Sequence, residues 1–245
     1  MDNLSIIIPS FRTPSYVEYL IASFLKFKPK SLNLEIIVVE NSSNDYEARL
    51  KNTYKDLIFI QNPTKAKVSV ANSEGIEVGK RFVTSPYTFI CHSDTCVTST
   101  DFFDSLFSKI KEGYELVGTR FDNNPERIKA IHISGLMIKS SILQKVNSAP
   151  QDGPTFPIGR LDVGDAYTKH FREESKEYFC FKNTHNFSDI SLSSDDPFVQ
   201  LNPDFSGDRC IGNSGKIIFI HMGRGSSTRT NSRSWGQVCG KILEQ

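Results

Sequence analysis

Residues 1–100 alternate short apolar runs with segments of helical periodicity, and this alternation constrains the fold more than any other feature. The apolar runs have the length of buried strands, and they are Leu4–Ile8, Glu35–Val39, Leu57–Ile60 and Tyr87–Cys91. The segments between them have apolar or small residues at helical spacing, and they begin near Tyr16, Tyr46 and Val68. Such β-α-β alternation predicts right-handed crossovers and a parallel sheet with helices on both faces.

The rest of the chain continues the pattern less regularly. We predict helices over residues 102–110 and 161–171, and strands over 115–119, 131–139 and 216–221. Proline and glycine cluster between residues 150 and 159, which indicates a loop, and residues 184–215 are too polar and turn-rich to assign. We therefore expect an α/β fold in a single domain. Its central sheet would be mostly parallel, with a small antiparallel portion.

The composition excludes several classes of protein. A chain of 245 residues with a net charge of +1 has no overall field to hold nucleic acid or an anionic membrane. Its five cysteines show no C-x-x-C pairing, so we expect no zinc site. Their odd number and the lack of a signal-peptide pattern favour a reducing compartment. We expect a cytoplasmic protein, with loose association at the inner face of the membrane left open.

The strand at Tyr87–Cys91 runs directly into the polar cluster His92–Thr95. A carboxylate at the end of such a strand lies at the edge where open α/β sheets bind ligands. We expect Asp94 to hold a divalent metal ion there, and the ion to hold a diphosphate. The alternative is that Asp94 only leads the chain into the next helix.

Four segments, in this order, carry a resemblance to a known family: LSIIIPSFR (4–12), EIIVVENSSND (35–45), NPTKAKVSVANSEGIEVGKRF (62–82) and FICHSDTCV (89–97). Together they resemble the family 2 glycosyltransferases of the GT-A fold, of the bacterial type that builds surface glycans. A dinucleotide-binding dehydrogenase would instead need G-x-G-x-x-G after a strand. The resemblance implies that residues 1–100 bind a nucleotide-sugar and that residues 101–245 bind the acceptor.

The resemblance also implies a set of contacts to the nucleotide-sugar. The expected residues are Pro9, Ser10, Arg12, Glu40, Lys65, Asn72, His92, Ser93, Asp94, Arg224 and Ser226. Two of them depart from the family pattern, which usually has Asp at the position of Glu40 and a carboxylate at that of His92. Glu40 would contact the base or ribose, and His92 a ribose or a metal-bound water. Arg12 and Lys65 can equally be ordinary surface cations.

The remaining roles implied by the resemblance are metal binding and catalysis. Asp94 and His221 would ligate Mn²⁺ or Mg²⁺, although His221 can also be a strand-ending residue satisfied by the backbone. Asp165 is the expected catalytic base, and Asp162 is the second choice; an Asp at a helix start can also act only as a cap. Apart from the resemblance, Trp235 can stack on an acceptor sugar or fill a gap in the core, and its polar neighbours favour partial exposure.

The resemblance therefore implies transfer of a sugar from a nucleotide-sugar donor, with UDP the expected nucleotide, to a glycan or lipid-linked acceptor. We expect inversion at the anomeric carbon and a role in polysaccharide biosynthesis. A module of the same fold that binds a nucleotide-sugar or glycan without turnover is the alternative, and His92 favours it. A sugar nucleotidyltransferase would need a glycine-rich N-terminal loop that this chain lacks.

Overall fold

The computed structural model describes residues 3–43, 46–66, 68–122, 128–151, 161–223 and 229–245, with the side chains of 229–233 left out. The strands are β1 (Asn3–Ser10), β2 (Asn33–Glu40), β3 (Ile58–Gln61), β4 (Tyr87–Cys91), β5 (Thr95–Val97), β6 (Leu116–Gly118), β7 (Gly135–Lys139), β8 (Phe179–Cys180), β9 (Lys182–Asn183), β10 (Asp208–Ile211) and β11 (Ile217–His221). The helices are α1 (Pro14–Phe27), α2 (Glu47–Thr53), α3 (Val68–Lys80), α4 (Asp101–Lys111), α5 (Ser140–Leu143), α6 (Asp165–Glu173), α7 (Pro197–Leu201) and α8 (Arg229–Glu244).

The central sheet has the strand order β3-β2-β1-β4-β7-β6-β8. Its first four strands are parallel to one another, as predicted. The expected antiparallel portion is confirmed, because β7 runs antiparallel to both β4 and β6. Parallel strands present their carboxyl ends at one edge, so β1, β2 and β4 bring Ser10, Glu40 and Cys91 to the same side of the sheet. The α/β fold with a mostly parallel sheet is therefore confirmed.

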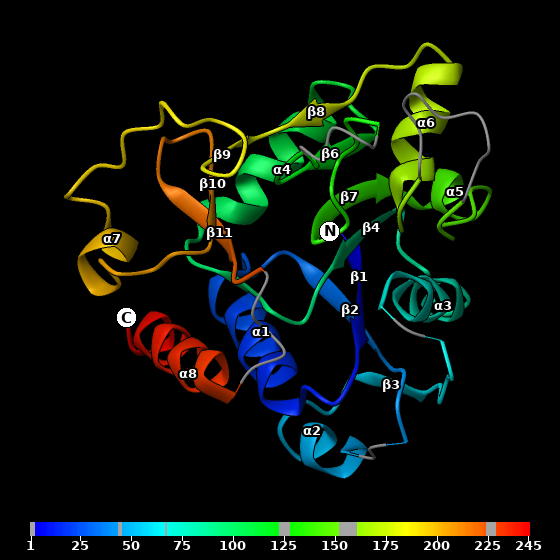
Figure 1. Cartoon of the computed structure of the whole chain (residues 1–245), viewed down its shortest axis with the longest axis horizontal. Coiled ribbons are helices and arrows are strands. Elements are labelled where there is room, and N and C mark those ends of the chain that lie inside the picture. Colours follow the sequence, from blue (N-terminus) through cyan, green and yellow to red (C-terminus); the bar gives the residue numbers. More distant parts are fainter. Residues whose placement is uncertain (1–2, 44–45, 67, 123–127, 152–160, 224–228) are drawn as a thin grey trace.

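Helices cover both faces of this sheet (Figure 1). Alternate residues of β1 point to opposite faces, so Ile6 and Ile8 join one apolar cluster and Ile7 joins the other. Helices α1, α4 and α8 pack on the first face, and α3, α5 and α6 on the second. The close approach of α3 depends on Gly79, since a Cβ there would lie 2.8 Å from Cγ2 of Ile7.

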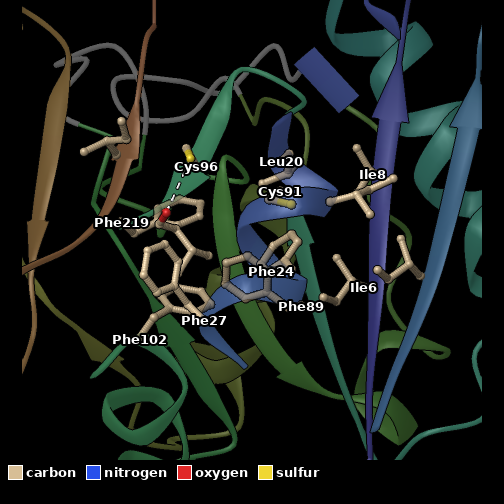
Figure 2. Packing of buried hydrophobic residues seen from close by; sticks show 14 of the residues in the cluster. Ile6, Ile8, Leu20, Phe24, Phe27, Phe89, Cys91, Cys96, Phe102 and Phe219 are labelled. Atoms are coloured by element: carbon tan, nitrogen blue, oxygen red, sulfur yellow. Dashed lines mark hydrogen bonds between the residues drawn. The ribbon is translucent and has the colours of Figure 1, made fainter. Parts of the chain in front are cut away.

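Aromatic rings fill the core on the α1 face. Phe24 of α1 packs against Phe89 and Phe102 (Figure 2), and the Phe102 and Phe219 rings are stacked with centroids 5.2 Å apart. Trp235 of α8 belongs to the same core and is only 1% exposed, with its ring edge-on to Tyr16. The expectation of a partly exposed Trp235 is therefore wrong, because the apolar face of α8 packs against α1 and outweighs the polar sequence around it.

A second sheet, with strand order β5-β11-β10-β9, is antiparallel throughout. Strand β5 follows the short turn after β4, so this sheet begins close to the carboxyl end of that strand. Strand β10 and helix α7 lie within residues 184–215, which the sequence pattern left unassigned. None of the helices in the described residues is long and apolar enough to cross a lipid bilayer. All five cysteines are free thiols.

Candidate functional site

Glu40 ends β2 and organises the loops at the carboxyl edge of the central sheet. Its side chain is completely buried. Oε1 accepts hydrogen bonds from the backbone N–H groups of Arg12 and Ser42, both at 3.0 Å, and Oε2 accepts from the Tyr46 hydroxyl at 2.9 Å. Glu40, the predicted nucleotide contact, thus links the loop after β1 to the loop after β2 and holds both in one arrangement.

A chain of hydroxyl groups links these loops to the end of β4. The Tyr46 hydroxyl lies 2.8 Å from Oγ of Ser10, which lies 3.1 Å from Oγ1 of Thr13. Thr13 in turn lies 3.0 Å from Oγ of Ser93, the neighbour of Asp94. Burial and the nearby Glu40 carboxylate both raise the pKa of Tyr46 far above its ordinary value. The Tyr46 hydroxyl therefore stays protonated and can donate a hydrogen bond. The structure therefore connects the predicted residues Ser10, Ser93 and Glu40 in one network.

Three possible metal ligands gather beside this network. His92, Asp94 and His221 each offer one ligand atom, and these atoms lie within 4.8 Å of one another. The pairing of β5 with β11 produces the cluster, because its register places Thr95 opposite His221. The backbone carbonyl of Asp94 also accepts from the N–H of Met222 at 2.9 Å. Two segments far apart in the sequence thus meet at the predicted metal site.

His92 is held by the predicted contact residue Asn72 of α3. The Asn72 amide nitrogen lies 2.9 Å from Nε2 of His92, so with this amide orientation Nε2 accepts and Nδ1 carries the proton. Nδ1 lies 4.0 Å from Oδ1 of Asp94. Burial lowers the pKa of His92 to about 4, against the opposing effect of the Asp94 carboxylate. His92 is therefore neutral at physiological pH, with one ring nitrogen already engaged.

His221 lies between two carboxylates. Its Nε2 is 3.5 Å from Oδ1 of Asp94, and its Nδ1 is 3.1 Å from Oδ2 of Asp208. Burial alone would lower the pKa of His221, but the two carboxylates outweigh it and raise the pKa to about 9. Burial alone would raise the pKa of Asp94, but the neighbouring His221 outweighs burial and lowers that pKa below its ordinary value. A proton on His221 thus offsets part of the negative charge of the two carboxylates.

Arg120, which follows β6, completes the charged cluster. Its guanidinium forms an ion pair with Oδ2 of Asp208. Burial of Asp208 acts to raise its pKa, but the hydrogen bond with His221 and the charge of Arg120 together lower it. The ring of His132 lies 5.5 Å from the His92 ring and 5.9 Å from the His221 ring, centroid to centroid. Imidazoles from three separate segments therefore lie close together, and two of them, His92 and His221, face Asp94.

The two predicted base residues lie at the start of α6 in different environments. Asp165 is 0% exposed, and its Oδ2 accepts from the backbone N–H of Asp162 at 2.9 Å. Asp162 is half-buried. Its carboxylate is close enough to His92 to oppose, in small part, the burial that lowers the pKa of that imidazole. Gly164 allows the tight approach to the helix with a φ of 81°. Asp162 therefore lies near His92, and Asp165 holds the backbone of Asp162 through a hydrogen bond.

The remaining predicted contacts differ in their burial. Pro9 is buried in β1, and Arg12 is exposed in a left-handed conformation with a φ of 58°. Lys65 is exposed in the loop before α3. Arg224 and Ser226 lie outside the described residues.

Several residues of the cluster gave no signal in the sequence. Thr13, Tyr46, Arg120 and Asp208 stand in no motif that marks them as site residues. Asp208 falls within the segment that could not be assigned, so neither its strand nor its contact with His221 was predicted. The only usable signal is the position of Thr13 and Tyr46 in the loops that follow β1 and β2.

Comparisons with known proteins give one family match and several structural matches. A sequence model of the family described as "Glycosyl transferase family 2" matches residues 5–162, more than half of the chain. A mannosyltransferase from Pyrobaculum calidifontis, solved in complex with GDP-Man and Mn²⁺, matches with a TM-score of 0.52 and 15% identity, covering 72% of this chain and 54% of the other. A search of curated proteins found no match.

Two further structures are less similar. TarS residues 1–349 of S. aureus with UDP-GlcNAc has a TM-score of 0.43 and 13% identity, covering 59% of this chain and 47% of TarS. Glucosyl-3-phosphoglycerate synthase of Mycobacterium tuberculosis has a TM-score of 0.49 and 12% identity, covering 73% and 70%. The chain spans about half the length of the first structures it matches.

Proposed function

Since the chain belongs to glycosyl transferase family 2 and has the GT-A fold, we propose that it transfers a sugar from a UDP-linked donor to a glycan or lipid-linked acceptor. The observation that carries the proposal is the meeting of Asp94 and His221 beside the carboxyl edge of the sheet. Residues 1–100 would hold the donor and residues 101–245 the acceptor. A hexose is the proposed sugar, and inversion the proposed stereochemistry.

The cluster fits a divalent cation. Ligand atoms about 2 Å from an ion lie at most about 4 Å apart, and Asp94 Oδ1 is 3.5 Å from Nε2 of His221. A carboxylate combined with imidazole suits Mn²⁺ better than Mg²⁺, which prefers oxygen ligands. Asp94 and His221 would hold the ion. His92 is a weaker candidate, because Asn72 already engages its Nε2. When bound, the ion would neutralise charge on the diphosphate leaving group.

The proton of the acceptor hydroxyl also needs a destination. In the reaction the acceptor oxygen forms a bond to the anomeric carbon, the bond from that carbon to the diphosphate breaks, and a carboxylate takes the proton. We assign the proton to Asp162, because it is half-buried whereas Asp165 is completely buried. Asp165 would position Asp162 by accepting its backbone N–H. This order reverses the preference that the sequence alone suggested.

The donor would lie along the loops that Glu40 holds. Ser10, Ser93 and Asn72 face the same edge through their hydrogen-bond network and their contact with His92. Arg12 and Lys65 are exposed near this edge and can reach a phosphate. Arg224 and Ser226 retain their proposed role toward the diphosphate by resemblance alone.

One assay tests the function against its alternatives. The protein is incubated with UDP-, GDP- and dTDP-sugars and Mn²⁺, and free nucleoside diphosphate is measured, with Asp94→Asn as the control. We expect diphosphate release from one donor by the wild type and none by the variant. Pyrophosphate would instead indicate a nucleotidyltransferase. Binding of a nucleotide-sugar in a thermal-shift assay, without release even with acceptor glycans, would favour the non-catalytic module that His92 suggests.

A further inference from the structure

The hydrogen-bonding environment of His221 is asymmetric. Nδ1 faces Oδ2 of Asp208 at 3.1 Å, whereas Nε2 faces Oδ1 of Asp94 at 3.5 Å. The sheet register explains the arrangement, because Asp208 of β10 lies directly opposite His221 of β11. On the other side of β11, His221 lies opposite Thr95, the residue after Asp94. One imidazole thus bridges a carboxylate on each neighbouring strand.

Two proton arrangements compete for the neutral form of this imidazole. In the first, Nδ1–H donates to Asp208 and the lone pair of Nε2 faces Asp94. In the second, Nδ1 accepts from Arg120, which lies 3.5 Å away, and Nε2–H donates to Asp94. The first uses a contact of 3.1 Å, whereas both contacts of the second are 3.5 Å. Hydrogen bonds weaken with distance over this range, so the first arrangement is favoured.

Arg120 strengthens this preference. Its guanidinium donates to the same Oδ2 of Asp208 that faces His221, and an arginine cannot accept a hydrogen bond. The ion pair therefore keeps Asp208 ionised and fixes its position against β11. The second carboxylate oxygen lies 3.5 Å from Nδ1 of His185, a half-exposed residue. Asp208 thus has one oxygen directed at the site and one directed away from it.

We propose that Asp208 is a positioning residue for the metal site: it accepts the Nδ1 proton of His221, which leaves the Nε2 lone pair to bind a divalent cation beside Asp94. The inference depends on the metal site of the proposed function. A carboxylate behind a ligating histidine sets its tautomer and ring orientation and makes it a stronger ligand. Arg120 acts one step further back, by holding Asp208.

The ion pair between Asp208 and Arg120 also joins β10 to the segment after β6, so a purely structural role must be separated from positioning. A double-mutant cycle does so, because a residue that acts through His221 has no effect once His221 is removed. The four proteins are the wild type, Asp208→Asn, His221→Ala and the double variant. Asn keeps the size of Asp208 but removes its negative charge, so the oxygen that Arg120 and Nδ1 of His221 share becomes a weaker acceptor or is replaced by an NH₂ group.

The measured quantity is the Kd for Mn²⁺ in the absence of nucleotide, obtained from the electron paramagnetic resonance signal of free Mn²⁺. We expect Asp208→Asn to weaken Mn²⁺ binding by about 10- to 100-fold. In the His221→Ala background the same change should alter the Kd by less than about 2-fold, since the path to the ion is gone. Thermal melting of each variant shows whether it is folded.

Two further variants sharpen the test. His185 contacts the other oxygen of Asp208. The variant His185→Asn is the matched control and should leave the Mn²⁺ Kd within about 2-fold of the wild type. Arg120→Met should weaken Mn²⁺ binding less than Asp208→Asn, because the carboxylate remains. An unchanged Kd in Asp208→Asn, equal losses in the presence and absence of His221, or no Mn²⁺ binding by the wild type would overturn the inference.

The outcomes separate the inference from the proposed function. If the wild type releases nucleoside diphosphate and Asp208→Asn binds Mn²⁺ normally, only the role of Asp208 is wrong. If the cycle gives the expected coupling and no nucleotide-sugar is consumed, the metal site is as described and the transferase assignment is wrong.

Discussion

The two ends of the candidate site satisfy their carboxylates in different ways. At the end of β2, Glu40 is completely buried and accepts hydrogen bonds from Arg12, Ser42 and Tyr46 at 2.9–3.0 Å. Beyond the end of β4, the side chain of Asp94 faces two imidazoles at 3.5 and 4.0 Å. The first carboxylate is fully engaged by the fold, whereas contacts of the second are longer than good hydrogen bonds.

This difference suggests that the two carboxylates have different roles. A carboxylate that accepts several short hydrogen bonds rigidifies the loops around it and needs no ligand. A buried carboxylate whose charge is balanced across longer contacts can exchange those partners for a cation. Glu40 would therefore act on stability and on the shape of the donor site, and Asp94 on chemistry. The following predictions test that division, from the largest expected effect to the smallest.

Asp94→Asn keeps the size of the side chain and removes the charge that a cation needs. We expect transfer to fall by about 10³-fold, as when a charge-stabilising group is deleted from an active site, while the melting temperature stays within a few degrees of the wild type. Turnover and Mn²⁺ binding are measured together, and EDTA treatment of the wild type serves as the control. Full activity after either change would show that Asp94 holds no ion.

Asp162→Asn removes the proposed base without disturbing α6. Loss of a general base lowers kcat by about 100-fold or more, and the KM for the donor should change little if Asp162 acts on the acceptor as proposed. The matched variant is Asp165→Asn, which should mainly lower stability, by about 1–3 kcal/mol, since the buried carboxylate accepts a backbone N–H. The reverse pattern, with kcat lost in Asp165→Asn alone, would return the base to Asp165.

Glu40→Gln tests the other end of the comparison. One of the two oxygens becomes an NH₂ group facing either backbone N–H donors or the Tyr46 hydroxyl, so we expect a loss of about 1–3 kcal/mol of stability. Urea denaturation measures this loss, and donor titration measures the accompanying rise in KM. Tyr46→Phe, which removes a single hydrogen-bonding group, should cost about 1 kcal/mol. If Glu40→Gln abolished donor binding with stability intact, Glu40 would be a direct nucleotide contact instead.

Arg12 gives the smallest predicted effect. Its φ of 58° lies in the left-handed region, where glycine is unstrained. Arg12→Gly should therefore be about 0.5–1 kcal/mol more stable than Arg12→Ala, which removes the same side chain but keeps the strained backbone. Both variants should raise the donor KM equally if the guanidinium contacts a phosphate. Equal stabilities in denaturation would show that the loop relaxes in solution.

Much of the fold followed from local pattern. The parallel strands and the helices between them were predictable because the period of the apolar residues reports which side of each element is buried. The antiparallel portion was also predicted, and Asp94 was identified because it lies in the polar cluster that follows an apolar run. The family resemblance covered the same part of the chain, where the motifs are contiguous.

The sequence by itself thus determined the central sheet and which carboxylates end its strands. Only the tertiary structure decided that Asp208 contacts His221 beside Asp94, because strand pairing between distant segments fixes that contact and no local period encodes the register. The same holds for Trp235, whose burial depends on the packing of α8 against α1. Local physics selects the elements, whereas the electrostatics of the site arise from the neighbours that folding brings together.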